Sequence, residues 1–251
     1  MIWKINLIMK KIRIAMWSGP RNISTALMRS FENRKDTSVL DEPFYAFYLN
    51  KKGYNHPLKE VILKSQSKNW DEVASFCSGT IPNQSNVWYQ KHMAHHILKG
   101  CDLNWLVRVK NCILIRDPKF VISSYSKKYK IESIRQLGYQ QQLKIFDYLV
   151  DQNNIEPIII DSNDLLEDPK RMITKLCNKI DIKFSRRMLS WPVGKRESDG
   201  VWGPYWYENV CKSTGFIAPS KKSINLGKNL YPIYEDCLSI YNFLFEKRLK
   251  L

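Results

Sequence analysis

Short apolar runs bounded by polar turns recur along the chain, and stretches with helical spacing separate them. The runs are "IRIAMW" at 12–17, "TSVL" at 37–40, "NVWYQ" at 86–90, "CILI" at 112–115 and "PIII" at 157–160. Runs of this length that alternate with helical segments are typical of an α/β fold with a mainly parallel sheet. The pattern therefore predicts five strands joined by covering helices.

Three later segments have apolar residues at helical spacing and predict helices at 133–152, at 168–180 and from about 233 to 250. The stripe of the first segment consists of Ile134, Leu137, Leu143, Phe146 and Val150. By contrast, the region 192–230 is rich in Gly, Ser, Trp and Lys and has no clear period. It predicts long loops, which are more often functional than idle when they are ordered.

Length and composition favour one globular domain over residues 1–251. The chain has 251 residues, of which 44% are hydrophobic and 25% are charged, enough for one substantial core. Lys and Arg number 40 against 24 Asp and Glu, a formal charge of +16, so the surface attracts anions. The basic residues form no dense arm or tail of the kind that binds nucleic acid, and we expect no nucleic-acid partner.

The cysteines and the N-terminus favour a cytoplasmic protein. The six cysteines show neither a C-x-x-C pair nor zinc-ligand spacing, and several lie in apolar runs, as core cysteines do. The first residues, "MIWKINLIM", are too short for a membrane span and are interrupted by Lys4. We expect residues 1–10 to be a loose extension and no stable membrane insertion. Translation starting at Met9 is an alternative.

The turn after the first strand has the composition of an anion site. Residues 16–31 read "MWSGPRNISTALMRSF". Gly19 permits close backbone approach, Arg21 supplies a positive charge, and a helix is expected to begin near Ser24 and Thr25, whose hydroxyls cap it or contact a phosphate. The stretch departs from the G-x-x-x-x-G-K-[ST] loop of nucleoside triphosphatases, since the second Gly and the Lys are missing.

This stretch resembles the 5′-phosphosulfate-binding loop of the sulfotransferases, which includes Asn22. A second motif of that family is a strand that ends in Arg, followed eight residues later by a helical Ser; together they hold the 3′-phosphate of the donor. In "CILIRDPKFVISSYSKKY" these positions are Arg116 and Ser124. Asp117 and Pro118 suit the start of the helix, which places Ser124 about two turns along it.

Two further segments extend the resemblance from about residue 11 to residue 206. "DSNDLLEDPKRM" is similar to an acidic turn of the family near the adenosine. "KRESDGVWGPYW" is similar to its late loop over the 3′-phosphate, whose matching residues are Lys195, Arg196, Gly200 and Trp202. The resemblance implies a three-layer α/β/α, P-loop-like fold. It also implies 3′-phosphoadenosine 5′-phosphosulfate (PAPS) as co-substrate and a small-molecule acceptor with a hydroxyl or amine.

Two residues are candidates for the base that removes the acceptor proton. Glu42, in "VLDEPFY", follows the second strand, and carbohydrate and lipid sulfotransferases place a catalytic Glu in a similar "E-P" setting. His92, in "WYQKHM", lies near the catalytic His of cytosolic sulfotransferases but is offset by one. We favour Glu42, with Lys91 as a second cation on the bridging oxygen and Arg21 on the leaving 5′-phosphate.

Neighbouring aromatic residues are candidates for the acceptor pocket: Phe44, Tyr45, Phe47, Tyr48 and Trp70. The histidines at 92, 95 and 96 match no standard metal-site spacing, and sulfuryl transfer can use fixed cations, so we expect no metal. Two rival functions remain open. One is a kinase or nucleoside triphosphatase of the same nucleotide-binding fold. The other is a non-catalytic protein that binds polyanions through its positive charge.

Overall fold

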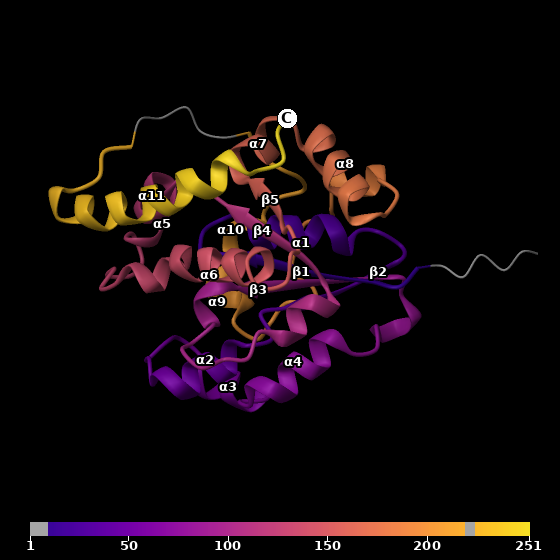
Figure 1. Ribbon diagram of the computed structural model, residues 1–251, viewed down its shortest axis with the longest axis horizontal. Helices are drawn as coiled ribbons and strands as arrows, with labels where there is room; N and C mark the ends of the chain where they lie inside the picture. The colour runs from indigo at the N-terminus through magenta and orange to yellow at the C-terminus, as the bar shows by residue number, and fades with distance from the viewer. Residues whose placement is uncertain (1–9, 219–223) are drawn as a thin grey trace, which may run out of the picture.

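The computed structural model describes residues 10–218 and 224–251. The expected N-terminal extension, apart from its last residue, and the alternative start at Met9 lie outside the described residues. The described chain folds around one central sheet, with helices on both of its faces (Figure 1).

Five strands of the described chain form this sheet, in the order β2-β3-β1-β4-β5, and all pair in parallel. Their bounds are Ile12–Ser18 (β1), Thr37–Asp41 (β2), Val87–Met93 (β3), Lys110–Ile115 (β4) and Ile158–Asp161 (β5). Each predicted strand is present within three residues of its expected bounds. The prediction of an α/β fold with a mainly parallel sheet is therefore confirmed.

Helices cover both faces of the sheet. The α-helices are α1 Ser24–Glu32, α2 Tyr45–Lys52, α3 Lys59–Ser65, α4 Trp70–Ser78, α5 Pro118–Tyr125, α6 Tyr139–Val150, α7 Ser162–Glu167, α8 Pro169–Ile180, α9 Gly203–Trp206, α10 Glu208–Cys211 and α11 Tyr231–Glu246. Short 3₁₀ helices are η1 Pro82–Gln84, η2 Ala94–His96, η3 Asn104–Arg108, η4 Ile134–Leu137, η5 Arg186–Leu189 and η6 Lys228–Leu230. Helices α1 and α8 pack on one face, and α4, α5, α6 and α11 on the other.

The central strand is apolar on both sides, as a strand covered on both faces must be. Because side chains alternate along a strand, Ile14 and Met16 of β1 pack against α1 and α8, whereas Ala15 and Trp17 pack on the opposite face. All four are fully buried. This double burial fixes the register of β1 and hence the point at which the chain leaves the sheet.

The predicted helix at 133–152 is divided at Gly138, whose φ of 82° ends η4 and precedes α6. The break shifts the buried face, so that Ile145 and Leu149 are buried in place of the expected Leu143 and Val150. Helix α11 also ends four residues before the expected position. There the Leu249 amide donates to the carbonyl of Ile159 in β5 at 2.8 Å, which draws the chain onto the sheet.

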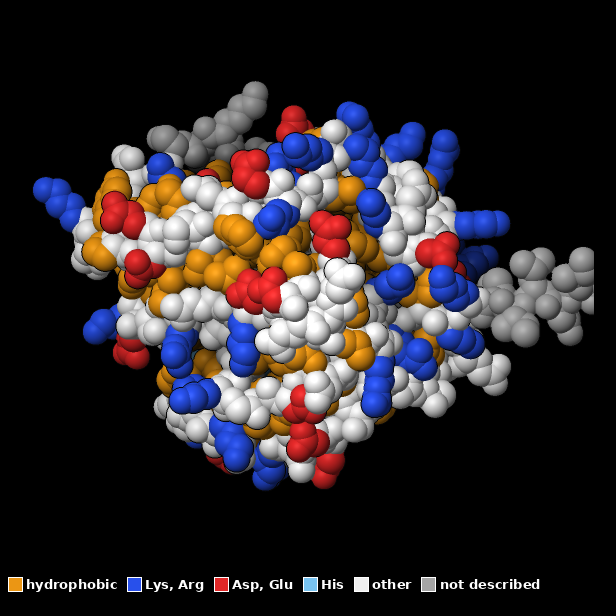
Figure 2. All heavy atoms as spheres, viewed as in Figure 1, with side chains coloured by type: hydrophobic (Ala, Val, Ile, Leu, Met, Phe, Trp, Pro, Cys, Tyr) orange, Lys and Arg blue, Asp and Glu red, His pale blue; other side chains and the backbone are white. Residues whose placement is uncertain are grey.

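The region 192–230 contains the short helices α9 and α10 within long connections, in agreement with the expected loops. Lys and Arg side chains are scattered over the visible face of the molecule and interspersed with acidic ones (Figure 2). Among the described residues no helix combines the length and apolarity needed to cross a membrane.

Candidate functional site

A crevice lies at the carboxyl ends of the neighbouring strands β1 and β4. Helix α1, which follows β1, packs on one face of the sheet, and α5, which follows β4, packs on the other. Where the connections of two neighbouring strands leave toward opposite faces of the sheet, a crevice opens between the connections at the strand ends. Open α/β sheets bind ligands in this crevice. The turn after β1 and the beginning of α5 therefore face the same crevice.

The turn between β1 and α1 alternates in backbone handedness. Arg21 (φ 62°) and Ile23 (φ 58°) adopt the left-handed conformation, whereas Asn22 between them does not. Alternation of this kind forms concavities of successive backbone N–H groups that bind anions. Ile23 immediately precedes α1, and its side chain cannot cap the helix as Ser24 was expected to do. The N–H groups at the start of α1 are therefore available to an anion.

Gly19 brings this turn into contact with the break before α6. A Cβ on Gly19 would lie 2.3 Å from the carbonyl oxygen of Leu137, and one on Gly138 would lie 3.2 Å from the Gly19 Cα. Gly19 is not among the residues that line the cavity. The close approach that this glycine permits is thus between two backbone segments, whereas the sequence predicted an approach to a phosphate.

Buried polar contacts fix the rest of the turn. The Asn22 side-chain amide donates to the carbonyl of Leu114 in β4 at 3.0 Å, and the Ser162 hydroxyl lies 3.2 Å from the Asn22 carbonyl. The hydroxyls of Ser24 and Thr25 line the cavity and form no hydrogen bond with a described residue. The turn is therefore held through the side chain and the carbonyl of Asn22, which leaves the hydroxyls of Ser24 and Thr25 free for a ligand.

Arg21, Arg116 and Ser124 meet at the crevice, although 95 residues of sequence separate the two arginines. Arg21 Nε donates to Ser124 Oγ at 2.9 Å, and an Arg116 Nη donates to the Arg21 carbonyl at 2.7 Å. Arg116 and Ser124, eight residues apart in the sequence, therefore both contact Arg21 in the turn between β1 and α1. The Asp117 side chain forms no ion pair with Arg116; it accepts a hydrogen bond from the Lys119 amide at the start of α5.

The two guanidinium groups are half-buried and form no ion pair with any described carboxylate. Burial lowers the pKa of both arginines; for Arg116 the neighbouring Arg21 adds to this effect, whereas Tyr139, Asp161 and Asp117 offset part of it. The Nε of Arg116 has no hydrogen-bond partner among the described residues. Since a partly buried cation without an ion-pair partner is costly, the chemistry of this pair suits an anionic ligand.

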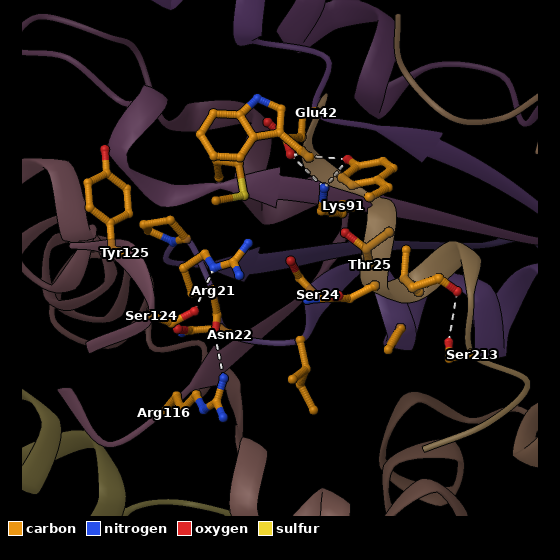
Figure 3. Close-up of a pocket in the computed structure, with 18 of the residues that line it drawn as sticks. Arg21, Asn22, Ser24, Thr25, Glu42, Lys91, Arg116, Ser124, Tyr125 and Ser213 are labelled. Atoms are coloured by element: carbon orange, nitrogen blue, oxygen red, sulfur yellow. Dashed lines mark hydrogen bonds and ion pairs between the residues drawn. The ribbon is translucent and has the colours of Figure 1, made fainter. Parts of the chain in front are cut away.

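These residues line one cavity of about 440 Å³. Figure 3 shows Arg21, Ser124 and Arg116 on one side of it and the pair Glu42 and Lys91 on another, with Ser24 and Thr25 of α1 between them. The cavity therefore combines a cationic region with a region that contains a carboxylate.

Lys91 is buried in a compact polar cluster. Its Nζ lies 2.9 Å from Asp41 Oδ1, 2.5 Å from Glu42 Oε1 and 2.6 Å from the Tyr207 hydroxyl. That hydroxyl also lies 2.7 Å from Asp41 Oδ2 and accepts the indole N–H of Trp202 at 2.9 Å. All three ammonium protons therefore have acceptors. The cluster contains Asp41 and Tyr207 in addition to Glu42 and Lys91, which the sequence predicted.

The cluster changes the proton affinity of its members. Burial raises the pKa of Glu42, Lys91 offsets part of this effect, and the neighbouring Asp41 adds to it. For Lys91, burial alone would lower the pKa, but the two carboxylates outweigh it and raise that pKa. Lys91 therefore stays charged, while Glu42 accepts a proton at higher pH than an exposed glutamate does.

The backbone of Glu42 is strained. Its φ of 40° lies in the left-handed region, which side-chain-bearing residues rarely adopt. The surrounding bonds hold it there, because its N–H donates to the Lys91 carbonyl at 2.9 Å and its carbonyl accepts from the Gln66 amide at 3.1 Å. Such strain persists where the structure fixes one side-chain direction, here toward Lys91.

His92 lies on the other face of the sheet. Neighbouring residues of a strand point to opposite faces, so Lys91 faces the cavity while His92 enters the core and stacks on Trp17 at 4.4 Å between ring centroids. Its Nε2 lies 3.1 Å from Gln90 Oε1, and burial lowers its pKa to about 3. His92 does not line the cavity.

Comparison with known families identifies the chain. A profile of the family described as "Sulfotransferase domain" matches residues 12–238. The chain belongs to the sulfotransferase family. It is also 35% identical over 232 residues to an Arabidopsis thaliana protein named branched-chain-amino-acid aminotransferase-like protein 2, covering 92% of this chain. A second Arabidopsis thaliana protein, named branched-chain-amino-acid aminotransferase-like protein 1, is 35% identical over 234 residues. The sulfotransferase spans 41% of the length of each of these relatives.

Solved structures agree with the fold. A sulfotransferase domain from the curacin biosynthetic pathway superposes with a TM-score of 0.55 at 15% identity, covering 96% of this chain and 99% of that one. A sulfotransferase from Alicyclobacillus acidocaldarius gives a TM-score of 0.51 at 10% identity, covering 95% and 97%. These likenesses, together with the parallel sheet and its covering helices, confirm the predicted three-layer, P-loop-like fold.

The four late-loop residues that match the family motif lie outside the cavity lining, although Trp206 at the end of this loop lines it. Lys195 is exposed, and Arg196 Nε lies 3.6 Å from Glu32 in α1. The Gly200 amide donates to Asp41 at 3.0 Å, and Trp202 is buried against Tyr207. In the structure Arg196 contacts α1, and Gly200 and Trp202 contact the cluster around Lys91, whereas the sequence predicted that all four residues contact the donor.

The predicted aromatic pocket is also rearranged. Phe44, Phe47 and Trp70 pack in the core, and Tyr48 lies behind the cavity wall, so that only Tyr45 of the expected five lines the cavity. Residues that the sequence did not assign to this pocket take their places, namely His56, His95, His96, Tyr125, Trp206 and Tyr207. The described residues contain no group of three or more side chains arranged to bind a metal.

We predict that Lys91→Met lowers the free energy of unfolding by about 3–5 kcal/mol at neutral pH, because it leaves two carboxylates buried without their cation. Urea unfolding followed by circular dichroism measures the loss. The deficit should shrink as the pH falls, since protonation removes the buried negative charge.

The double substitution Lys91→Met with Asp41→Asn is the control, because it removes one carboxylate together with the ammonium. We expect it to recover part of the lost stability. A single Lys91→Met variant as stable as the unmodified protein would contradict the buried charge cluster.

Proposed function

We propose that this sulfotransferase transfers the sulfuryl group of PAPS to a hydroxyl group of a small-molecule acceptor. The observation that carries the proposal is the pair of half-buried guanidinium groups, Arg21 and Arg116, which have no carboxylate partner among the described residues. A doubly phosphorylated nucleotide supplies the missing negative charge. The family match supports sulfuryl transfer as the reaction.

Within this proposal the phosphates divide between two groups of residues. Arg21 and the N–H groups of the turn bind the 5′-phosphate, with Asn22 holding the turn and the hydroxyls of Ser24 and Thr25 facing the ligand. Arg116 and Ser124 bind the 3′-phosphate, as in the family resemblance. Ser124 Oγ accepts a bond from Arg21 and still has its own proton to donate to a phosphate oxygen.

The reaction then requires one proton transfer and one exchange of S–O bonds. Glu42 removes the acceptor proton, the acceptor oxygen forms a bond to sulfur, and the bond between sulfur and the 5′-phosphate oxygen breaks. The products are a sulfate ester, the nucleotide 3′,5′-bisphosphate (PAP) and protonated Glu42. Lys91 orients Glu42 through the 2.5 Å bond; its three protons are bonded to Asp41, Glu42 and Tyr207, so it does not reach the bridging oxygen as the sequence suggested. Arg21 stabilises the leaving phosphate.

Two other functions fit the site less well. A kinase or triphosphatase needs a cation at the β- and γ-phosphates, and the turn lacks the lysine that provides it. A non-catalytic polyanion binder relies on a dense basic surface, whereas the visible face carries basic and acidic groups side by side (Figure 2). Both alternatives predict ligands that differ from PAP.

We expect calorimetry to detect PAP binding and to detect neither ATP nor GTP binding, because the paired arginines match two separate phosphates. The binding should persist at raised ionic strength, since a half-buried site is screened less than an exposed one. Preference for ATP or GTP would favour the kinase or triphosphatase. Binding of heparin alone, lost steeply with salt, would favour the polyanion binder.

Arg116→Ala and Ser124→Ala should each weaken PAP binding by about 1–3 kcal/mol, the range for a lost hydrogen bond to a charged group. Adenosine 5′-phosphosulfate, which lacks the 3′-phosphate, is the control ligand. Its affinity should change little in both variants. An equal loss for the two ligands would show that these residues do not recognise the 3′-phosphate.

Glu42→Gln keeps the side-chain volume but cannot accept a proton, so we expect turnover to fall by roughly 10²–10⁴-fold with PAP affinity nearly unchanged. Turnover is measured as transfer of labelled sulfate from PAPS to an acceptor. His92→Asn is the matched variant and should retain most of the rate. Collapse of the His92 variant together with normal turnover by the Glu42 variant would reverse the two roles.

The pH profile gives a second measure of the same base. Because the pKa of Glu42 is raised, its carboxylate is lost as the pH falls through that higher value. The rate should therefore decline on the acid side above the ordinary glutamate pKa of 4.5, and the decline should be absent from the residual activity of Glu42→Gln.

A further inference from the structure

The turn between β2 and α2 is bonded to a side chain that comes from another helix. The turn spans residues 42–45 and is closed by the Tyr45 amide, which donates to the Glu42 carbonyl at 3.1 Å. Gln66, directly after α3, donates its side-chain amide to the same carbonyl at 3.1 Å. Its Oε1 accepts the backbone N–H of Ala46 in α2, also at 3.1 Å. One side chain therefore joins the turn to the helix that follows it.

Gln66 also caps α2 from outside that helix. The residue that precedes α2 is Phe44, whose side chain forms no capping bond. A capping side chain usually accepts the N–H of the second or third helical residue, and Ala46 is the second residue of α2. The acceptor that Phe44 lacks is thus supplied by Gln66.

The two bonds need both halves of the carboxamide. A backbone carbonyl only accepts and a backbone N–H only donates, so the side chain that bridges them must have one donor and one acceptor. An ionised glutamate offers only acceptors, and a lysine offers only donors. Gln66 does not line the cavity, so its influence on a reaction there passes through the residues that it bonds.

The bond to Glu42 acts on a strained backbone. Glu42 has a φ of 40°, although it precedes Pro43 and residues before proline favour extended conformations. Its N–H donates to the Lys91 carbonyl at 2.9 Å, so the bond from Gln66 fixes the residue on its carbonyl side as well. Strain of this kind persists only where the surroundings determine the conformation several times over.

The backbone conformation of Glu42 decides where its carboxylate lies. In the left-handed conformation, Glu42 Oε1 lies 2.5 Å from Lys91 Nζ (Figure 3). Because β3 holds the Glu42 N–H, a return of φ to the negative range would swing Cβ about the N–Cα bond and carry the carboxylate away from Lys91. A constraint on the Glu42 carbonyl is therefore also a constraint on the proposed base.

Resting on the proposed function, in which Glu42 removes the acceptor proton, we propose that Gln66 is a positioning residue of the reaction. Its carboxamide holds the Glu42 backbone in the left-handed conformation and so keeps the carboxylate at Lys91. The charged or titratable groups around this carboxylate are Asp41 in β2, Tyr45 in α2, Lys91 in β3 and Tyr207 after α9. Gln66 adds no charge to them, so its effect is one of placement.

Gln66→Leu tests the proposal, because it keeps most of the side-chain volume and removes both bonds. The pKa of Glu42 is followed by NMR with ¹³C-labelled glutamate, and Glu42→Gln identifies the signal. Burial is the larger cause that raises this pKa, so release of the side chain should lower it toward the ordinary 4.5. Sulfate transfer from PAPS to phenol or ethanolamine should fall by about 10–10²-fold in kcat, with PAP affinity within about twofold.

Two variants separate placement from stability. Ile62→Val is the matched control, because Ile62 in α3 is fully buried in the cluster that also contains Tyr45. It loosens the packing of α3 on α2 and should change neither the Glu42 pKa nor kcat. Gln66→Glu keeps an acceptor for the Ala46 amide but loses the donor to Glu42. It should fold with α2 capped and still lose turnover.

The double substitution Glu42→Gln with Gln66→Leu determines whether the two residues act together. Its turnover should be no lower than that of Glu42→Gln alone, because the second change no longer has a base to displace. A further loss in the double variant would assign Gln66 a separate, structural role and overturn the proposal.

The other outcomes distinguish this proposal from the proposed function. An unchanged Glu42 pKa with normal turnover in Gln66→Leu, or the same losses in Ile62→Val, would overturn the positioning role while PAP binding still supports the proposed function. If neither probe accepts sulfate, the Glu42 pKa in Gln66→Leu decides. Absence of PAP binding, or normal turnover by Glu42→Gln, would contradict the proposed function and with it the role of Gln66.

Discussion

The buried ammonium group of Lys91 holds together the segments that form the reactive end of the cavity. It bonds to Asp41 at the end of β2, to Glu42 directly after it, and to Tyr207, which follows the late loop. Removing any one partner leaves charge or hydrogen-bonding capacity buried without compensation. The position and proton affinity of Glu42 therefore depend on the whole cluster, and Tyr207 links the chain after the late loop to it.

At the other end of the cavity, the cations have no carboxylate partner among the described residues. Arg21 and Arg116 converge because β1 and β4 are neighbours whose following helices leave toward opposite faces. Their charge is not neutralised by a described carboxylate, although acidic residues such as Asp117 are close in sequence. One end of the cavity thus has its charges paired within the protein, and the other leaves them for a ligand. This division makes the two ends of the cavity chemically different.

The sequence predicted the elements with strong local signals. Apolar runs located all five strands, and the spacing of Arg116 and Ser124 located two residues that meet Arg21 in space. It could not locate Tyr207, because the place of this residue depends on the path of loops at 192–230 that have no period. It also assigned Phe44 and Trp70 to the pocket, since aromatic residues of the core and of a cavity wall have the same local pattern.

The contact between Gly19 and Gly138 bears on the thermodynamics of binding any anionic ligand at the turn between β1 and α1. The two backbones touch with no space for a side chain, and Asn22 adds a buried bond to β4. The turn is therefore already ordered by the fold before a ligand arrives. A ligand that binds a preformed turn does not bear the conformational entropy of ordering it, so most of the energy from its phosphate contacts remains available as affinity.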